Sequence, residues 1–152
     1  MKIVLLIFTL LSCQNLYAQR SDQAYDSSLA KSLGADDYGM KMYVFVLLKT
    51  GSKTIENKTV RDSLFSGHLA NINRLADEGK LVVAGPFAKN ELSYRGIFIL
   101  NVKTEEEAKA LLETDPAIKE NLLHPEIVKW YGSAALPTYL ETHKKIEKQH
   151  TK

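Results

Sequence analysis

Six segments of this chain have the residue pattern of a strand or a helix, and the order of these segments is compatible with few folds. Runs rich in β-branched and aromatic residues indicate four strands, over residues 42–48, 81–84, 94–102 and 126–131. Apolar residues spaced three and four apart indicate two helices, one over residues 60–78 and one that begins after Thr104. The order strand, helix, strand, strand, helix, strand predicts an α+β fold with both helices on one face of an antiparallel sheet.

Residues at the ends of these segments support the assignment. Gly79 follows the first helix, where glycine commonly closes a helix. Thr104 and Glu107 have the spacing of a capping box. Asp115-Pro116 ends the second helix, because proline disfavours helical backbone in the residue before it. Beyond the last strand, residues 137–148 predict a charged C-terminal helix.

The second face of the predicted sheet has no helix to cover it. An uncovered apolar sheet face favours association, and a second copy of the same domain related by two-fold symmetry offers a matching surface. We therefore expect a homodimer, with the C-terminal helix as an alternative cover for part of that face.

The start of the chain has the layout of a secretory signal peptide. Met1 and Lys2 precede an apolar run over residues 3–11, and a short polar stretch then ends at the small residue Ala18. The apolar run is too short for a bilayer, which takes about 20 residues. Cleavage after Ala18 is favoured and predicts a periplasmic or secreted protein. In the alternative, the sequence Leu-Leu-Ser-Cys is a lipidation signal and Cys13 anchors a lipoprotein.

Four parts of the chain follow from these signals. Residues 1–18 are the expected signal peptide, and residues 19–40 are a polar N-terminal arm with at most one helical turn. Residues 41–133 hold the strands and the two helices, and residues 134–152 hold the C-terminal helix.

Composition argues against several classes of function. Cys13 is the only cysteine, so cleavage after Ala18 leaves no disulfide, thiolate nucleophile or cysteine metal site. A formal net charge of +2 provides no basic field for nucleic acid. No later run is apolar enough for a membrane helix. His124, His143 and His150 lack a defensible metal-site spacing, and no phosphate-binding glycine loop occurs, so no metal or cofactor is predicted.

Three stretches of the chain resemble the YCII-related family. They are His68-Leu69-Ala70-Asn71-Ile72 running into Glu78-Gly79-Lys80-Leu81, then Ala84-Gly85-Pro86-Phe87, and then Glu106-Glu107-Ala108 followed by Asp115-Pro116. The resemblance spans most of residues 42–131. It implies a ferredoxin-like fold that forms a dimeric α/β barrel, a small-molecule pocket, and His68 and Asp115 as the active-site pair. Many members have an aromatic residue after the Asp-Pro step, where this chain has Ala117.

The residues themselves leave two interpretations of that pair open. His68 lies on the apolar face of its helix, where a histidine with a carboxylate partner can act as a general acid or base near neutral pH. The alternative is a histidine that only packs. Asp115 either orients His68 or caps backbone amides at the turn, and the two roles are compatible.

Further residues are candidates for binding a substrate. Arg61 lies seven residues before His68, so it shares that helix face and can bind an anionic group, with a solvated salt bridge as the alternative; Arg95 has a similar status. Gly85 and Pro86 shape the end of the second strand, as a pocket wall or as an ordinary turn. Phe87 and Tyr43 are candidate apolar lining residues, with packing in the core as the alternative.

Two functions are consistent with this sequence. In the first, the pocket holds a small organic acid and His68, oriented by Asp115, moves a proton in a lyase, isomerase or hydrolase step. In the second, the domain binds a ligand without catalysis, or is a structural dimer, in the cell envelope.

Overall fold

The computed structural model describes residues 25–148. The expected signal peptide, its cleavage site after Ala18 and the lipidation candidate Cys13 lie outside these residues. Along the chain the elements are α1 (Ser27–Leu33), β1 (Met40–Thr50), α2 (Lys58–Asp77), β2 (Leu81–Pro86), β3 (Tyr94–Leu100), α3 (Glu105–Leu112), α4 (Pro116–Lys119), β4 (Leu123–Ser133), the 3-10 helix η1 (Leu136–Tyr139) and α5 (Leu140–Ile146).

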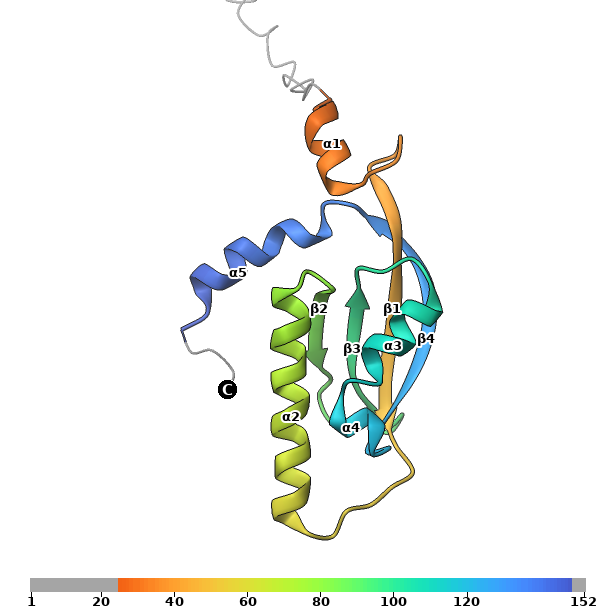
Figure 1. The fold of residues 1–152 in the computed structure, drawn as a ribbon, viewed down its shortest axis with the longest axis vertical. Helices are drawn as coiled ribbons and strands as arrows, with labels where there is room; N and C mark the ends of the chain where they lie inside the picture. The colour runs from red at the N-terminus through yellow and green to blue at the C-terminus, as the bar shows by residue number, and fades with distance from the viewer. Residues whose placement is uncertain (1–24, 149–152) are drawn as a thin grey trace, which may run out of the picture.

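The four strands form one antiparallel sheet in the order β2-β3-β1-β4, and α2, α3 and α4 lie against one of its faces (Figure 1). This strand order, with the two helical crossovers, is the ferredoxin-like arrangement. The predicted α+β fold is therefore confirmed, and the C-terminal helix is present as α5.

The main differences from the sequence prediction are at strand ends. β4 begins at Leu123, three residues before the predicted strand, and it pairs with β1 along the whole run from Met40–Ser133 to Thr50–Leu123. Pro125 lies within this strand without breaking it, because β4 is an edge strand and its outer side needs no ladder hydrogen bond.

The main core lies between the sheet and its helices. Alternate residues of β1, namely Val44, Val46 and Leu48, point toward α2 and α3 and pack with Leu75 and Leu112. The capping box predicted for Thr104 and Glu107 is present and fixes the start of α3. This core holds α2 and α4 in the positions on which the candidate site depends.

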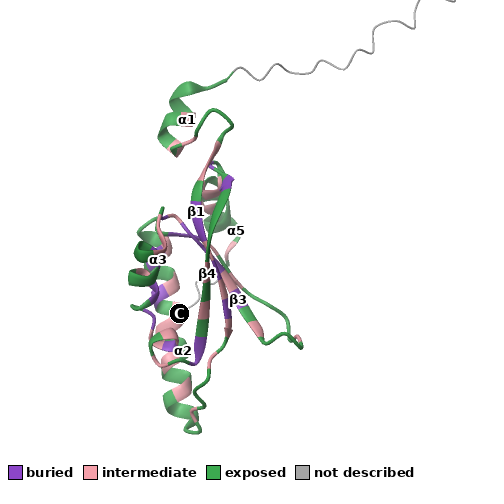
Figure 2. Ribbon diagram, turned by 90° about the vertical axis from the view of Figure 1, so that its right-hand side faces the viewer, coloured by how far each residue is buried: buried purple, intermediate pink, exposed green. Residues whose placement is uncertain are grey.

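The opposite face of the sheet is only partly covered. Tyr43, Val82 and Ile99 are buried in a second cluster against which Leu136 of η1 packs. Farther along, Val128 is 57% exposed and Trp130 is 38% exposed on β4, which Figure 2 colours largely as exposed. An apolar strip of the sheet thus faces solvent in the single chain.

The described part of the N-terminal arm contains a capped helix of seven residues, α1, which is longer than the single helical turn expected from the sequence. Asp26 caps the start of α1, Gly34 ends it at a φ of 70°, and no residue of the helix is buried. Asp36 then fixes the arm to the sheet, because its carboxylate accepts a 2.5 Å hydrogen bond from the Tyr131 hydroxyl. That bond is the main reason why the pKa of Asp36 lies below its usual value.

None of the helices between residues 25 and 148 has the length and apolar character that a membrane crossing requires.

Candidate functional site

A cavity of about 700 Å³ lies on the helix-covered face of the sheet, between α2 and the adjoining ends of β1, β2 and β3. Its walls are mostly apolar. The apolar lining residues are Leu48, Ile55, Phe65, Leu69, Ile72, Ala84, Pro86, Phe98, Leu122 and Leu123. A cavity of this size and lining suits a small organic molecule.

His68 projects into this cavity from the middle of α2. Its ring stacks on Phe98, with centroids 5.9 Å apart and planes 25° from parallel, and the Phe65 ring approaches its edge at 6.3 Å. The His68 side chain is only 12% exposed. Two aromatic contacts therefore hold the imidazole in one orientation at the cavity wall.

Asp115 lies behind His68 and is fully buried. Its Oδ2 atom is 2.6 Å from His68 Nδ1, while its Oδ1 atom accepts hydrogen bonds from the backbone amides of Ala117 at 2.9 Å and Ile118 at 3.3 Å. The carboxylate thus caps α4 and contacts the histidine at the same time. The structure brings the two predicted residues together, and we call them the His68–Asp115 pair.

The contact determines which imidazole nitrogen carries the proton in neutral His68. A carboxylate only accepts hydrogen bonds, so Nδ1 must donate to Asp115 and Nε2 keeps its lone pair. Within residues 25–148, Nε2 has no hydrogen-bond partner. The arrangement leaves one basic nitrogen available to a molecule bound in the cavity.

A close approach of α2 to α4 sets the position of the His68–Asp115 pair. Gly67 packs against Pro116, and a Cβ atom added to Gly67 would lie 2.7 Å from Pro116 Cγ. These two residues directly adjoin His68 and Asp115 in the chain. Gly67 was not among the residues that sequence reasoning singled out, although a glycine inside a helical pattern costs about 1 kcal/mol relative to alanine and so indicates a packing constraint.

Several predicted binding residues line the same cavity. Arg61 lies on its wall, and Arg61 Nη1 donates a 2.9 Å hydrogen bond to the Ile55 carbonyl. Gly85 and Pro86, at the end of β2, also line it, as does Arg95 of β3. The structure therefore groups Arg61, Gly85 and Pro86 with His68, as the sequence suggested.

Tyr43 and Phe87 lie elsewhere, contrary to the sequence expectation. Tyr43 is on the opposite face of the sheet, where its ring packs on Trp130 at 5.8 Å and its hydroxyl donates to the Ser133 carbonyl at 2.9 Å. Phe87 follows the end of β2 and packs against Tyr94 at 6.1 Å while remaining partly exposed. Tyr43 is therefore a core residue, whereas Phe87, at 46% exposed, lies neither in the core nor in the cavity.

Comparison with known proteins relates this site to a family. A model of the YCII-related domain matches residues 42–131, from β1 to β4, a stretch that contains both His68 and Asp115. The chain belongs to the YCII-related family. No curated protein gives a significant match. Among solved structures, the YCII-related chain is similar to 5-chloro-2-hydroxyhydroquinone dehydrochlorinase from Burkholderia phenoliruptrix AC1100 in complex with 2,5-dihydroxybenzoquinone. The identity is 21%, the TM-score is 0.42, and the match covers 57% of this chain and 92% of that one.

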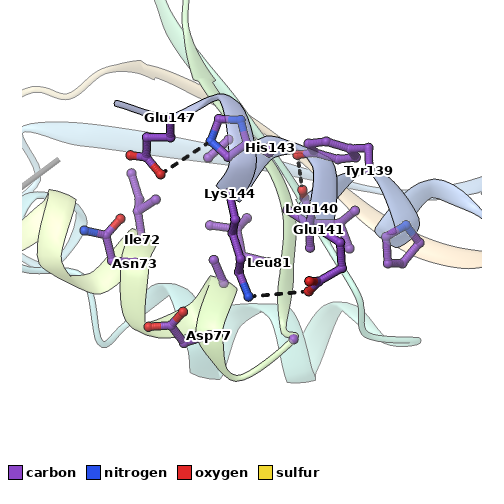
Figure 3. A pocket seen from close by; sticks show the side chains of 15 residues that line it. Ile72, Asn73, Asp77, Leu81, Tyr139, Leu140, Glu141, His143, Lys144 and Glu147 are labelled. Atoms are coloured by element: carbon purple, nitrogen blue, oxygen red, sulfur yellow. Dashed lines mark hydrogen bonds and ion pairs between the residues drawn. The ribbon is translucent and has the colours of Figure 1, made fainter. Parts of the chain in front are cut away.

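A second cavity, of about 900 Å³, lies where α5 crosses α2 and β2, and of these elements only α5 is outside the YCII-related match. Figure 3 shows two pairs of ionisable groups at α5, with His143 4.0 Å from Glu147 and Lys144 3.5 Å from Glu141. The Tyr139 hydroxyl donates to the Val82 carbonyl at 2.5 Å, and burial raises the pKa of Tyr139. This cavity has no counterpart of the buried His68–Asp115 pair, so the first cavity is the candidate active site. Within residues 25–148, no group of three metal-binding side chains gathers in either cavity.

Proposed function

We propose that this YCII-related protein is an enzyme that moves a proton on a small organic acid bound in the first cavity. His68 is the general acid or base, and Asp115 orients it. The reaction is a lyase, isomerase or hydrolase step. The observation that carries this proposal is the 2.6 Å contact between His68 Nδ1 and a buried Asp115 carboxylate, at the wall of an apolar cavity.

The geometry supports a defined proton route. His68 Nε2 accepts the substrate proton, and the positive charge that develops on the ring is stabilised by the Asp115 carboxylate. The backbone amides of Ala117 and Ile118 hold that carboxylate in place, so it need not move during the reaction. The burial of Asp115 and of most of the His68 side chain strengthens the interaction between the two charges.

Turnover by a His68→Ala variant tests this proposal. A panel of small cyclic and aromatic acids is incubated with the wild-type protein and with the variant, and products are followed by proton NMR. Because general acid–base catalysis contributes about 10²- to 10⁴-fold in rate, we expect any acid that turns over to lose at least about 100-fold in His68→Ala. His143→Ala serves as the matched control, since His143 lies on α5 in the second cavity. Equal turnover by wild type and His68→Ala would refute the proposal.

A non-catalytic ligand-binding protein or structural dimer is the second candidate function. The observation that favours it is the exposed apolar strip at Val128 and Trp130, which suits an interface and needs no chemistry. If the whole acid panel binds without turnover, this candidate replaces the first one.

We further propose that the protein is exported and homodimeric. The sequence of residues 1–18 supports a signal peptide, with residues 19–40 as an arm before the domain at 41–133 and a C-terminal segment at 134–152. The exposed strip on β4 supports a second copy packed face to face with the first.

Native mass spectrometry of protein recovered from a Gram-negative expression host checks both points at once. We expect a periplasmic species with the mass of two chains that each begin at Gln19. A retained Met1 in all fractions contradicts export, and a single-chain mass contradicts the dimer. A lipid adduct on Cys13 indicates the anchored form instead of the released one.

A further inference from the structure

A bulge in the sheet directs one arginine into the candidate active site. Leu48 of β1 pairs with Gly96 of β3, but the next residue, Lys49, pairs with Tyr94, so Arg95 is an extra residue in β3. In a bulge of this kind the strict alternation of side chains between the two faces is interrupted. Arg95 and Gly96 consequently both line the cavity, although they are consecutive in a strand.

The guanidinium groups in this cavity lack carboxylate partners. Arg95 Nε donates to the Thr50 hydroxyl at 2.7 Å, and Arg61 donates to a backbone carbonyl, so both use neutral acceptors. In residues 25–148, neither arginine forms a salt bridge, whereas Arg74, away from the cavity, pairs with Glu78 at 2.7 Å. Each guanidinium has five N–H donors, and each of these two spends only one of them on a protein acceptor.

The charged side chains that line the cavity all have one sign. Its charged lining residues are Lys53, Arg61 and Arg95, and none of the described residues that line it is acidic. Lys53 is paired with Glu120, which leaves the two arginines as the uncompensated charges. The nearby Asp115 carboxylate is already committed to His68 and to two backbone amides.

Two uncompensated arginines favour an anionic ligand. The other lining residues limit the shape of that ligand. Between the arginines and His68 the walls are apolar and include the rings of Phe65 and Phe98. A carboxylate fits the fork of a guanidinium with two parallel hydrogen bonds. A flat apolar body attached to that carboxylate fits the rest of the cavity.

We infer that Arg95 is the specificity-determining anchor of this cavity, with Arg61 as a second donor, and that the ligand is a planar carboxylate with an apolar ring or chain. The guanidinium holds the carboxylate at the cavity edge and the apolar body extends toward His68. This inference rests on the proposed function, since it names the substrate class of the same site.

Binding of benzoate, with benzamide as its neutral analogue, tests the anchor. Both are titrated by NMR into the wild-type protein, Arg95→Gln and the control Arg74→Gln, and signals from residues around the cavity are followed. We expect Arg95→Gln to weaken benzoate binding about 10- to 100-fold, because a charge-assisted hydrogen bond is lost. Arg74→Gln leaves benzoate binding unchanged, and benzamide binds more weakly than benzoate and is insensitive to Arg95→Gln.

The inference is overturned if benzoate does not bind in the cavity, if Arg95→Gln binds it as tightly as the wild type, or if benzamide matches it. The readout is affinity, so it is separate from catalysis. Arg95-dependent binding of benzoate in a protein that turns over no acid refutes only the proposed chemistry. Turnover that depends on His68, together with Arg95-independent benzoate binding, refutes only the anchor.

Discussion

In Asp115→Asn, neutral His68 is expected to move its proton from Nδ1 to Nε2 while the domain stays folded. The side-chain oxygen of the asparagine accepts the hydrogen bonds from the backbone amides of Ala117 and Ile118, because the side-chain –NH₂ group is a donor and cannot accept them. The –NH₂ group is then left facing His68, so Nδ1 must become the acceptor. Nε2 loses its lone pair, and turnover of any acid that the wild type processes falls about 100-fold or more.

Ring ¹⁵N chemical shifts distinguish the two tautomers directly. The wild-type protein should show Nδ1 protonated, and Asp115→Asn should show Nε2 protonated, at a pH where His68 is neutral. The solvent-exposed His124 serves as an internal control, since Asp115 does not contact it. Identical His68 shifts in the two proteins would contradict the orienting role assigned to Asp115.

Asp115→Ala separates the role of the carboxylate in folding from its role in orientation. This change leaves two backbone amides and His68 Nδ1 without their acceptor in a buried site, so we expect a loss of about 2–4 kcal/mol in the free energy of unfolding. Thr104→Ala removes an exposed N-cap of α3 and should cost about 1 kcal/mol, which makes it the matched control. Urea denaturation measures both.

The second large effect is expected for Gly67→Ala, which forces α2 away from α4. In an unobstructed helix this change would stabilise by about 1 kcal/mol. Here the new Cβ atom meets the Pro116 ring, and overpacking of this kind costs about 1–3 kcal/mol. We expect a net loss of stability and, because the clash adjoins His68 and Asp115, about a 10- to 100-fold loss of turnover from misplacement of the pair.

A double-mutant cycle with Pro116→Ala identifies the cause. Removing the proline ring relieves the clash, so Gly67→Ala should be less harmful in the Pro116→Ala background, as measured by urea denaturation. Gly85→Ala is the control, since a Cβ atom there meets no other atom within 4 Å although Gly85 lines the same cavity. A Gly67→Ala protein that gains about 1 kcal/mol in the free energy of unfolding and keeps the His68 ring shifts would exclude the expected clash with Pro116.

Local signals in the sequence were sufficient for the fold and for the positions of His68 and the Asp115-Pro116 turn, whereas the pairing of His68 with Asp115 was implied only by the resemblance to the YCII-related family. The order of the elements, the capping box at Thr104 and the Asp115-Pro116 step all depend on neighbours in the chain, so they could be recognised without tertiary information. His68 was assigned to the face of α2 that meets the sheet because helical spacing alone decides that.

Features that depend on strand register could not be recognised in the same way. β1 is apolar on both faces, so nothing in its sequence indicates that Val44 points toward α2 while Tyr43 points to the other side. Arg95 reaches the cavity only because of a bulge between two strands that are distant in the chain. The role of Gly67 becomes visible only once α4 is placed against α2.

The location of Trp130, the single tryptophan of the chain, has a practical consequence for biophysical work. It lies half-exposed beside Tyr43, on the sheet face opposite the cavity. Its fluorescence is therefore sensitive to whatever covers that face, while a molecule bound next to His68 is separated from it by the sheet. Emission from this protein would therefore report any chain that packs on that face, whereas ligand binding in the cavity has to be followed through signals of His68.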